Sequence, residues 1–148
     1  MLSSSTACVG RRPMTTIGRR RLTAAGLAAA TVSAGLAVRF ALRRGAASDV
    51  GGDALYAVLI YVIIVFLVPR ARPSVVAVVA GSLCVAIELF QLTTLPAAWA
   101  ATFPPVALVL GTGFDARDLV VYLIAVAGAA SMDKIIGARL NTPTPPPH

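Results

Sequence analysis

Four long apolar runs, separated by short polar or basic segments, dominate the pattern along this chain. Their apolar residues are continuous and do not alternate with polar ones, which argues against a β-barrel and favours membrane-spanning helices. A helix that crosses a hydrocarbon core of about 30 Å needs about 20 residues, so the shorter runs must extend into their flanks. The predicted spans are residues 22–42, 53–69, 74–95 and 118–136.

The stretch between the third and fourth runs is apolar, but prolines and glycines interrupt it too often for a regular span. These residues are Pro96, Pro104, Pro105, Gly111 and Gly113. Trp99 and Phe103, in the same stretch, are residue types typical of the membrane interface. We therefore predict an all-α polytopic membrane protein, a bundle of four transmembrane helices with an interfacial or re-entrant segment between the third and fourth.

Polar tails flank this helical domain, which we assign to residues 19–137. The basic, Ser/Thr-rich tail 1–18 and the Pro-rich tail 138–148 are both predicted to be disordered. Arg19-Arg20-Arg21 before an apolar run also resembles a twin-arginine export signal, and Met14 is a second candidate for the first residue. Because three further apolar runs follow, the chain would be a membrane protein under either of these alternatives.

Composition and charge agree with this class. Apolar residues make up 57% of the chain and charged residues 13%, against about 25% charged in soluble domains. The net charge of +7 lies in Lys/Arg clusters at the ends of the apolar runs, without interleaved aromatic residues. We therefore expect the lipid bilayer, and not nucleic acid, as the partner. The side that holds the termini carries more Lys and Arg, which predicts cytoplasmic N- and C-termini.

Acidic residues collect at the helix ends that this topology places outside. Glu88 lies inside the third run, about 21 Å from its inner end. A charge at that depth must face the bundle, be protonated or find a partner. Gln91 shares the helix face of Glu88. We expect one outer-leaflet pocket to gather Asp53, Glu88, Gln91 and Asp118, with Tyr122 one turn further along the fourth helix.

These residues also have structural explanations that stay open at this point. Glu88 and Gln91 can act as polar glue between helices, with Arg39 or Arg117 as the nearby basic partner of Glu88.

Helix capping explains the remaining acids. Asp115 and Asp118 fit the N-cap and third helical positions of a capping box. Asp53 can cap the second helix after a turn at Gly51-Gly52.

The sequence contains no recognisable catalytic pattern. There is no His or Cys cluster for a metal, no Ser elbow, no P-loop and no dinucleotide fingerprint. We therefore expect no cofactor, no metal and no enzymatic activity. The remaining alternative is an envelope enzyme that uses Glu88 and Asp118 as an acid–base pair.

Four motifs follow one another along the chain. They are Gly52-Asp53-Ala54-Leu55-Tyr56-Ala57, Glu88-Leu89-Phe90-Gln91, Leu110-Gly111-Thr112-Gly113-Phe114, and Asp118-Leu119 with Tyr122. Together they resemble a family of small bacterial integral membrane proteins known as domain of unknown function 2809, over about residues 22–136. The resemblance implies a multi-pass protein of the bacterial inner membrane, and it adds the loop residues Gly111, Gly113 and Phe114 to the candidate site. Relatives tend to carry a basic residue before this loop, and residues 97–109 have none.

The leading functional hypothesis is an envelope protein whose outer-leaflet pocket binds a lipid headgroup or a small polar ligand. One alternative is a small proton-coupled carrier that acts as a homo-oligomer, with Glu88 as the titrating group. Four small residues offer a packing face for such an oligomer: Gly26, Ala30, Ala34 and Ala37. The Glu-x-x-Gln motif with a later Asp is also loosely similar to VanZ-type proteins, which are linked to glycopeptide-antibiotic tolerance.

Overall fold

A computed structural model of the protein describes residues 15–41, 45–111 and 113–140. Residues 1–14 and 141–148, which make up most of the two predicted tails, lie outside these ranges. All regular secondary structure within the ranges is helical, which confirms the predicted all-α class. The helices are α1 (Thr16–Ala41), α2 (Ala46–Leu67), α3 (Pro73–Phe90), α4 (Leu95–Thr102), α5 (Val106–Leu110) and α6 (Ala116–Leu140).

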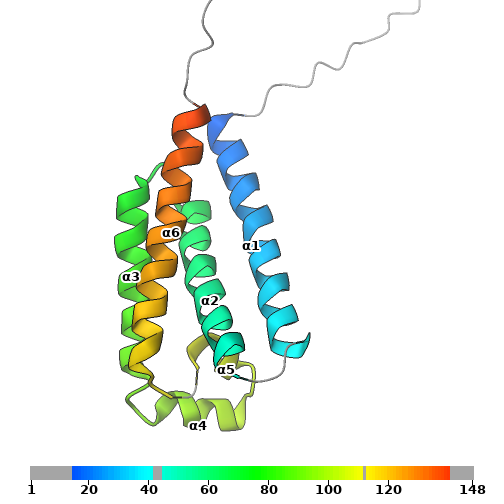
Figure 1. The fold of residues 1–148 in the computed structure, drawn as a ribbon, viewed down its shortest axis with the longest axis vertical. Helices are drawn as coiled ribbons and strands as arrows, with labels where there is room; N and C mark the ends of the chain where they lie inside the picture. The colour runs from blue at the N-terminus through cyan, green and yellow to red at the C-terminus, as the bar shows by residue number, and fades with distance from the viewer. Residues whose placement is uncertain (1–14, 42–44, 112, 141–148) are drawn as a thin grey trace, which may run out of the picture.

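In the described part of the chain, four helices are long and apolar enough to cross a membrane, namely α1, α2, α3 and α6. This confirms the predicted four-helix polytopic bundle. Figure 1 shows these helices side by side along one direction, with the start of α1 and the end of α6 at the same end of the bundle. We call this end the terminal end, and the opposite end the distal end.

The short helices α4 and α5 occupy the place of the predicted interfacial or re-entrant segment. Figure 1 shows α4 running across the distal end of the bundle rather than along it. Helix α3 stops at Phe90, whose carbonyl accepts a bond of 2.8 Å from the hydroxyl of Thr93. Trp99 holds α4 against this point, since its ring lies 5.8 Å from that of Phe90. The third span is therefore shorter than the apolar run that contains it.

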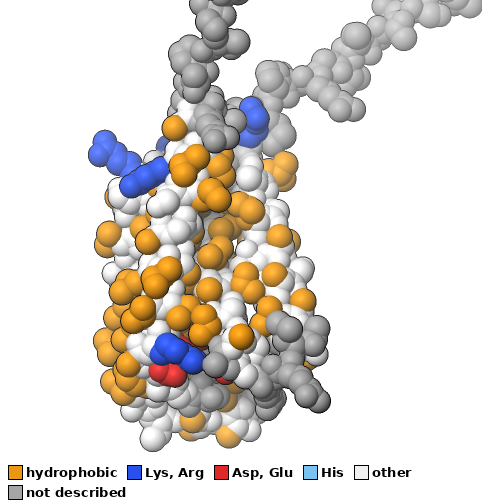
Figure 2. All heavy atoms as spheres, viewed as in Figure 1, with side chains coloured by type: hydrophobic (Ala, Val, Ile, Leu, Met, Phe, Trp, Pro, Cys, Tyr) orange, Lys and Arg blue, Asp and Glu red, His pale blue; other side chains and the backbone are white. Residues whose placement is uncertain are grey.

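The core of the bundle is built from small and β-branched side chains. Helices α2, α3 and α6 pack against one another, and α1 packs against α2. Among the described residues that form this core are Ala57 and Tyr61 of α2, Val76 and Ala80 of α3, and Val126 and Ala130 of α6. Small residues at helix contacts let the backbones approach closely, which is how helices associate in lipid. Large apolar side chains instead cover the outside of the bundle (Figure 2).

Helix α2 begins earlier than the sequence pattern suggests. Its N-cap is Gly45, whose N–H donates to the hydroxyl of Ser48 at 3.0 Å. The turn predicted at Gly51-Gly52 is therefore wrong, because both glycines lie inside the helix. A Cβ on Gly51 would lie 4.0 Å from the Val38 side chain, so this glycine lies where α2 meets α1. The predicted N-cap role of Asp53 is wrong for the same reason.

Candidate functional site

Glu88 lies in the last turn of α3, and its side chain is fully buried. Its Oε1 accepts a bond of 2.7 Å from the backbone N–H of Asp115. Its Oε2 accepts a longer bond of 3.4 Å from the hydroxyl of Tyr122. A buried carboxylate needs donors of this kind to replace its water. Both bonds run to α6 or to the residue before it, so Glu88 joins the distal end of α3 to the start of α6.

The predicted pairing of Glu88 with Arg117 is not what the structure describes. Arg117 instead lies beside two aspartates, 3.8 Å from Asp115 and 3.7 Å from Asp118. The Arg117 side chain is 44% exposed, and ion pairs of this length on an exposed group are weak. The Arg39 side chain lies outside the described residues.

The start of α6 confirms one predicted cap and corrects the other. Asp115 is the N-cap, because its Oδ1 accepts the N–H of Arg117 at 2.9 Å. In a capping box, Asp118 would accept the N–H of Asp115. Glu88 accepts that N–H instead, so the predicted capping role of Asp118 is wrong.

The Asp118 carboxyl group lacks a short hydrogen bond at its Oδ1 among the described residues, and the Arg117 Nε lies 3.7 Å from this oxygen. The oxygen is buried, and no hydrogen-bond partner reaches it from the part of the chain that the structure describes. Asp53, half-buried in α2, lies near enough to Asp118 for the two carboxyl groups to repel each other when both are ionised. We call Asp53, Glu88, Asp118 and Tyr122 the distal cluster.

Tyrosine rings line this cluster. Tyr122 is 5% exposed, and its ring lies 6.3 Å from that of Tyr56. The hydroxyl of Tyr56 donates to the carbonyl of Val109 at 2.7 Å, which ties α2 to α5. Sequence reasoning missed Tyr56 as a site residue. The available signal was its spacing, because Tyr56 follows Asp53 by three residues and shares its helix face.

Gln91 lies outside these contacts, at the C-cap of α3. Its amide packs against Gly111, where an added Cβ would lie 2.5 Å from the Gln91 Nε2. Gly111 has φ 68° and ψ −172°, a conformation that is almost confined to glycine. The other two loop candidates are less enclosed, since Gly113 is exposed and Phe114 is 39% exposed. The structure thus brings Asp53, Glu88, Asp118 and Tyr122 together, with Gln91 and Gly111 forming a separate contact.

A second polar cluster lies toward the terminal end. Arg20 of α1 pairs with Asp133 of α6 at 2.7 Å and donates to the Pro69 carbonyl at 2.9 Å. The hydroxyl of Tyr61 donates to the same Asp133 oxygen at 3.1 Å. Sequence reasoning treated Arg20 only as a topology signal. The signal that could have identified a partner for Arg20 was Asp133, the acid nearest the C-terminus of the chain.

The distal cluster is suited to bind a positively charged hydrogen-bond donor. It brings carboxyl oxygens from α2, α3 and α6 together in low-dielectric surroundings, and such oxygens are acceptors when ionised. No group of His, Cys, Asp and Glu within the described ranges is arranged to hold a metal ion.

Comparison with known proteins assigns the chain to a family. No curated protein and no solved structure matches it. A family model described as Protein of unknown function (DUF2809) matches residues 42–126. The match contains the whole distal cluster, whereas Arg20 and Asp133 lie outside it. Because the matched region is more than half of the chain, this protein belongs to the DUF2809 family, as the resemblance of its motifs predicted.

Proposed function

We propose that this protein binds an amine-bearing headgroup or small polar ligand at the distal cluster. The observation that carries the proposal is the buried Oδ1 of Asp118, which lacks a hydrogen-bond partner among the described residues. The Arg117 Nε lies 3.7 Å from this oxygen, beyond hydrogen-bonding distance, and a bound ammonium group would supply the missing hydrogen bond. Asp53 lies beside it and would share the charge.

The other cluster residues support this role by position. Glu88 has a donor for each of its oxygens from its own chain, so it forms the inner wall rather than the binding group. Tyr122 and Tyr56 add aromatic faces, which attract cations. Asp118 and Asp53 are only half-buried, so a ligand at the membrane surface has a route to them.

We also propose the setting in which this binding occurs. The protein lies in the bacterial inner membrane with both termini cytoplasmic, so that the distal cluster faces the outer leaflet. The small residues Gly26, Ala30, Ala34 and Ala37 are exposed on α1, which supports a homo-oligomer that packs through this face. A ligand-binding role in the envelope would agree with the loose similarity to VanZ-type proteins.

The test measures headgroup preference by native mass spectrometry. The purified protein would be titrated with phosphatidylethanolamine and phosphatidylglycerol of identical acyl chains. We expect the wild type to prefer phosphatidylethanolamine. In Asp118→Asn, the ratio of the two lipid affinities should fall about tenfold, which is the scale of one hydrogen bond to a charged group. Free ethanolamine as a competitor distinguishes a small polar ligand from a lipid headgroup.

Asp49→Asn is the matched control, because Asp49 is an exposed acid in the first turn of α2. This variant removes the same charge from the same end of the bundle, and its headgroup preference should match that of the wild type. An unchanged preference in Asp118→Asn, or an equal loss in Asp49→Asn, would overturn the proposal.

A proton-coupled carrier is the second candidate, and the electrostatic interaction between the nearby Asp53 and Asp118 carboxyl groups favours it. Loading and release of the proton that such a pair shares would couple ligand movement to a pH gradient. Uptake into proteoliposomes that depends on the gradient, and that Asp53→Asn abolishes, would support this function over simple binding.

A further inference from the structure

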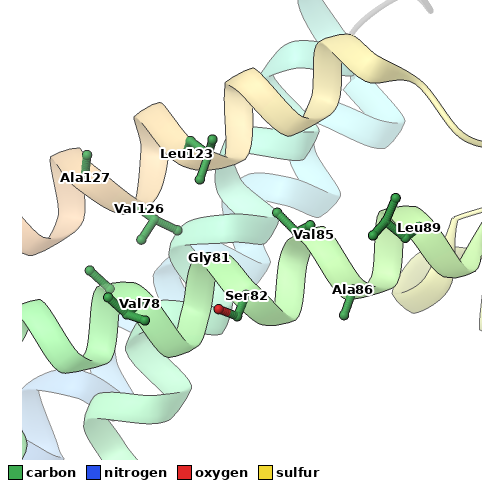
Figure 3. A pocket seen from close by; sticks show the side chains of 10 residues that line it. Val78, Gly81, Ser82, Val85, Ala86, Leu89, Leu123, Val126 and Ala127 are labelled. Carbon is green, nitrogen blue, oxygen red and sulfur yellow. The ribbon is translucent and has the colours of Figure 1, made fainter.

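An apolar groove of about 600 Å³ lies on the bundle surface between α3 and α6 (Figure 3). Small residues of both helices leave it hollow, and larger side chains such as Leu89 and Leu123 border it. Its volume falls in the range of about 300–1,000 Å³ that is typical of ligand sites. Gly81 lines the groove, and a Cβ added there would be in ordinary contact with the Leu123 side chain at 3.7 Å. We call this feature the α3–α6 groove.

The length of the groove fits one lipid leaflet. Its lining on α3 extends from Ala77 to Leu89. At 1.5 Å per residue, this stretch spans about 18 Å along the helix. One leaflet contributes about 15 Å of hydrocarbon, half of a core of about 30 Å. The groove therefore has the dimensions for one acyl chain lying along the bundle.

The distal end of the groove lies close to the distal cluster along both helices, although no residue of the cluster lines it. Leu89 directly follows Glu88 in α3, and Leu123 directly follows Tyr122 in α6. Arg117 lies less than two turns before Leu123 on α6, and its side chain is 44% exposed. Its contacts with Asp115 and Asp118, at 3.8 and 3.7 Å, are longer than charge-assisted hydrogen bonds. The guanidinium group is therefore available to a phosphate, which its geometry suits.

We infer that the α3–α6 groove and the distal cluster form one site for a phospholipid that carries a primary amine. One acyl chain lies in the groove, the phosphate binds Arg117, and the ammonium group binds Asp53 and Asp118. This inference rests on the proposed function and deepens it by naming the ligand class. A second copy of the chain fits the groove less well, because an apolar helix in this position would leave the Asp118 Oδ1 without a donor.

The test locates the acyl chain by photocrosslinking. The full chain would be reconstituted in nanodiscs with phosphatidylethanolamine that carries a diazirine in one acyl chain, and crosslinked peptides would be mapped by mass spectrometry. We expect crosslinks in the segments of α3 and α6 that line the groove. Gly81→Leu fills the groove, and its crosslink yield there should fall about fivefold or more.

Two controls keep this test decisive. Gly35→Leu adds the same side chain at an open position on α1 outside the proposed oligomer face, where nothing lies within 4 Å of an added Cβ, and it should keep the wild-type yield. Ala127→Phe narrows the groove from α6, and it serves as a second filling variant if Gly81→Leu does not fold. Crosslinks spread evenly around the bundle, or crosslinks between two copies of the chain at the groove, would overturn the inference.

Failure of the inference is distinguishable from failure of the proposed function. If filling the groove leaves the crosslinks unchanged while Asp118→Asn still removes the headgroup preference, the groove assignment fails and headgroup binding stands. If Asp118→Asn and wild type have the same preference, headgroup binding fails and the ligand class named here fails with it.

Discussion

At the scale of single residues, the carboxyl groups of the distal end divide into two roles. Glu88 and Asp115 accept bonds from backbone N–H groups, so the Glu88 carboxylate links α3 to the start of α6 and the Asp115 carboxylate caps α6. Asp118 accepts no such bond through its Oδ1, and Asp53 lies beside it. Substitution of the first pair should therefore affect folding, whereas substitution of the second pair should affect binding.

Gly111 allows a residue-scale prediction about stability. Its φ of 68° with ψ of −172° is costly for any residue with a Cβ, and the Cβ would also collide with the Gln91 amide. We expect Gly111→Ala to lower the free energy of unfolding by about 1–3 kcal/mol. Denaturant titration of the detergent-solubilised protein measures this change.

Gly113→Ala is the control for that change, because nothing lies within 4 Å of an added Cβ and its φ is not in the left-handed region. We expect it to stay within about 0.5 kcal/mol of wild type, as for most exposed substitutions. Equal stabilities of the two alanine variants would contradict the backbone assignment at Gly111.

The sequence alone predicts which acids gather, but not how they pair. Helical spacing and the number of spans are enough to bring Asp53, Glu88 and Asp118 to the same end of the bundle. The partner of Glu88 is a backbone N–H, which no side-chain pattern indicates. Capping rules assign that N–H to the Asp118 carboxylate, but the carboxylate of Glu88 in α3 accepts it instead. Contacts between helices therefore decided what local rules left open.

At the scale of helices, the apolar runs predict the number of spans better than their ends. Gly51-Gly52 resembles a turn in isolation, yet Ser48 closes the first turn of α2 ahead of it. In α3, the apolar run continues past the helix end at Phe90, because apolar character does not distinguish a span from an interfacial segment. The ends follow from hydrogen bonds and proline positions, which hydropathy does not report.

The terminal-end contact of Arg20 gives an element-scale prediction. Arg20 connects α1 to Asp133 of α6 and to the Pro69 carbonyl. We expect Arg20→Ala to destabilise the bundle by about 1.5–3 kcal/mol, the scale of a charge-assisted hydrogen bond. A double-mutant cycle with Asp133→Ala, followed by denaturant titration, should give a coupling of about 0.5–3 kcal/mol.

Arg21→Ala is the matched control for this cycle. Arg21 is exposed in the same basic flank, so its loss changes the charge near the membrane equally. We expect little change in stability, and additive effects when it is combined with Asp133→Ala. Coupling of the same size for Arg21 would show that general charge, and not the Arg20 contact, holds α1 in place.

At the scale of the whole molecule, the two ends of the bundle differ in charge. On the face seen in Figure 2, Lys and Arg side chains gather toward the terminal end, and a further one lies beside acidic side chains near the distal end. The loops near the terminal end include Arg70 and Arg72, and Lys134 lies in the last turns of α6. The positive-inside rule therefore predicts that the terminal end faces the cytoplasm.

Cysteine accessibility in intact cells tests this orientation. In a background without Cys8 and Cys84, single cysteines would replace Gly45, Ser74 or Gly113, which are all exposed. Gly45 and Gly113 lie in distal connections, so a membrane-impermeant maleimide should label both positions. Ser74 begins α3 at the terminal end and should react only after permeabilisation. The reverse labelling pattern would place the distal cluster in the cytoplasmic leaflet, where the same amine-binding chemistry would serve a different pool of lipid.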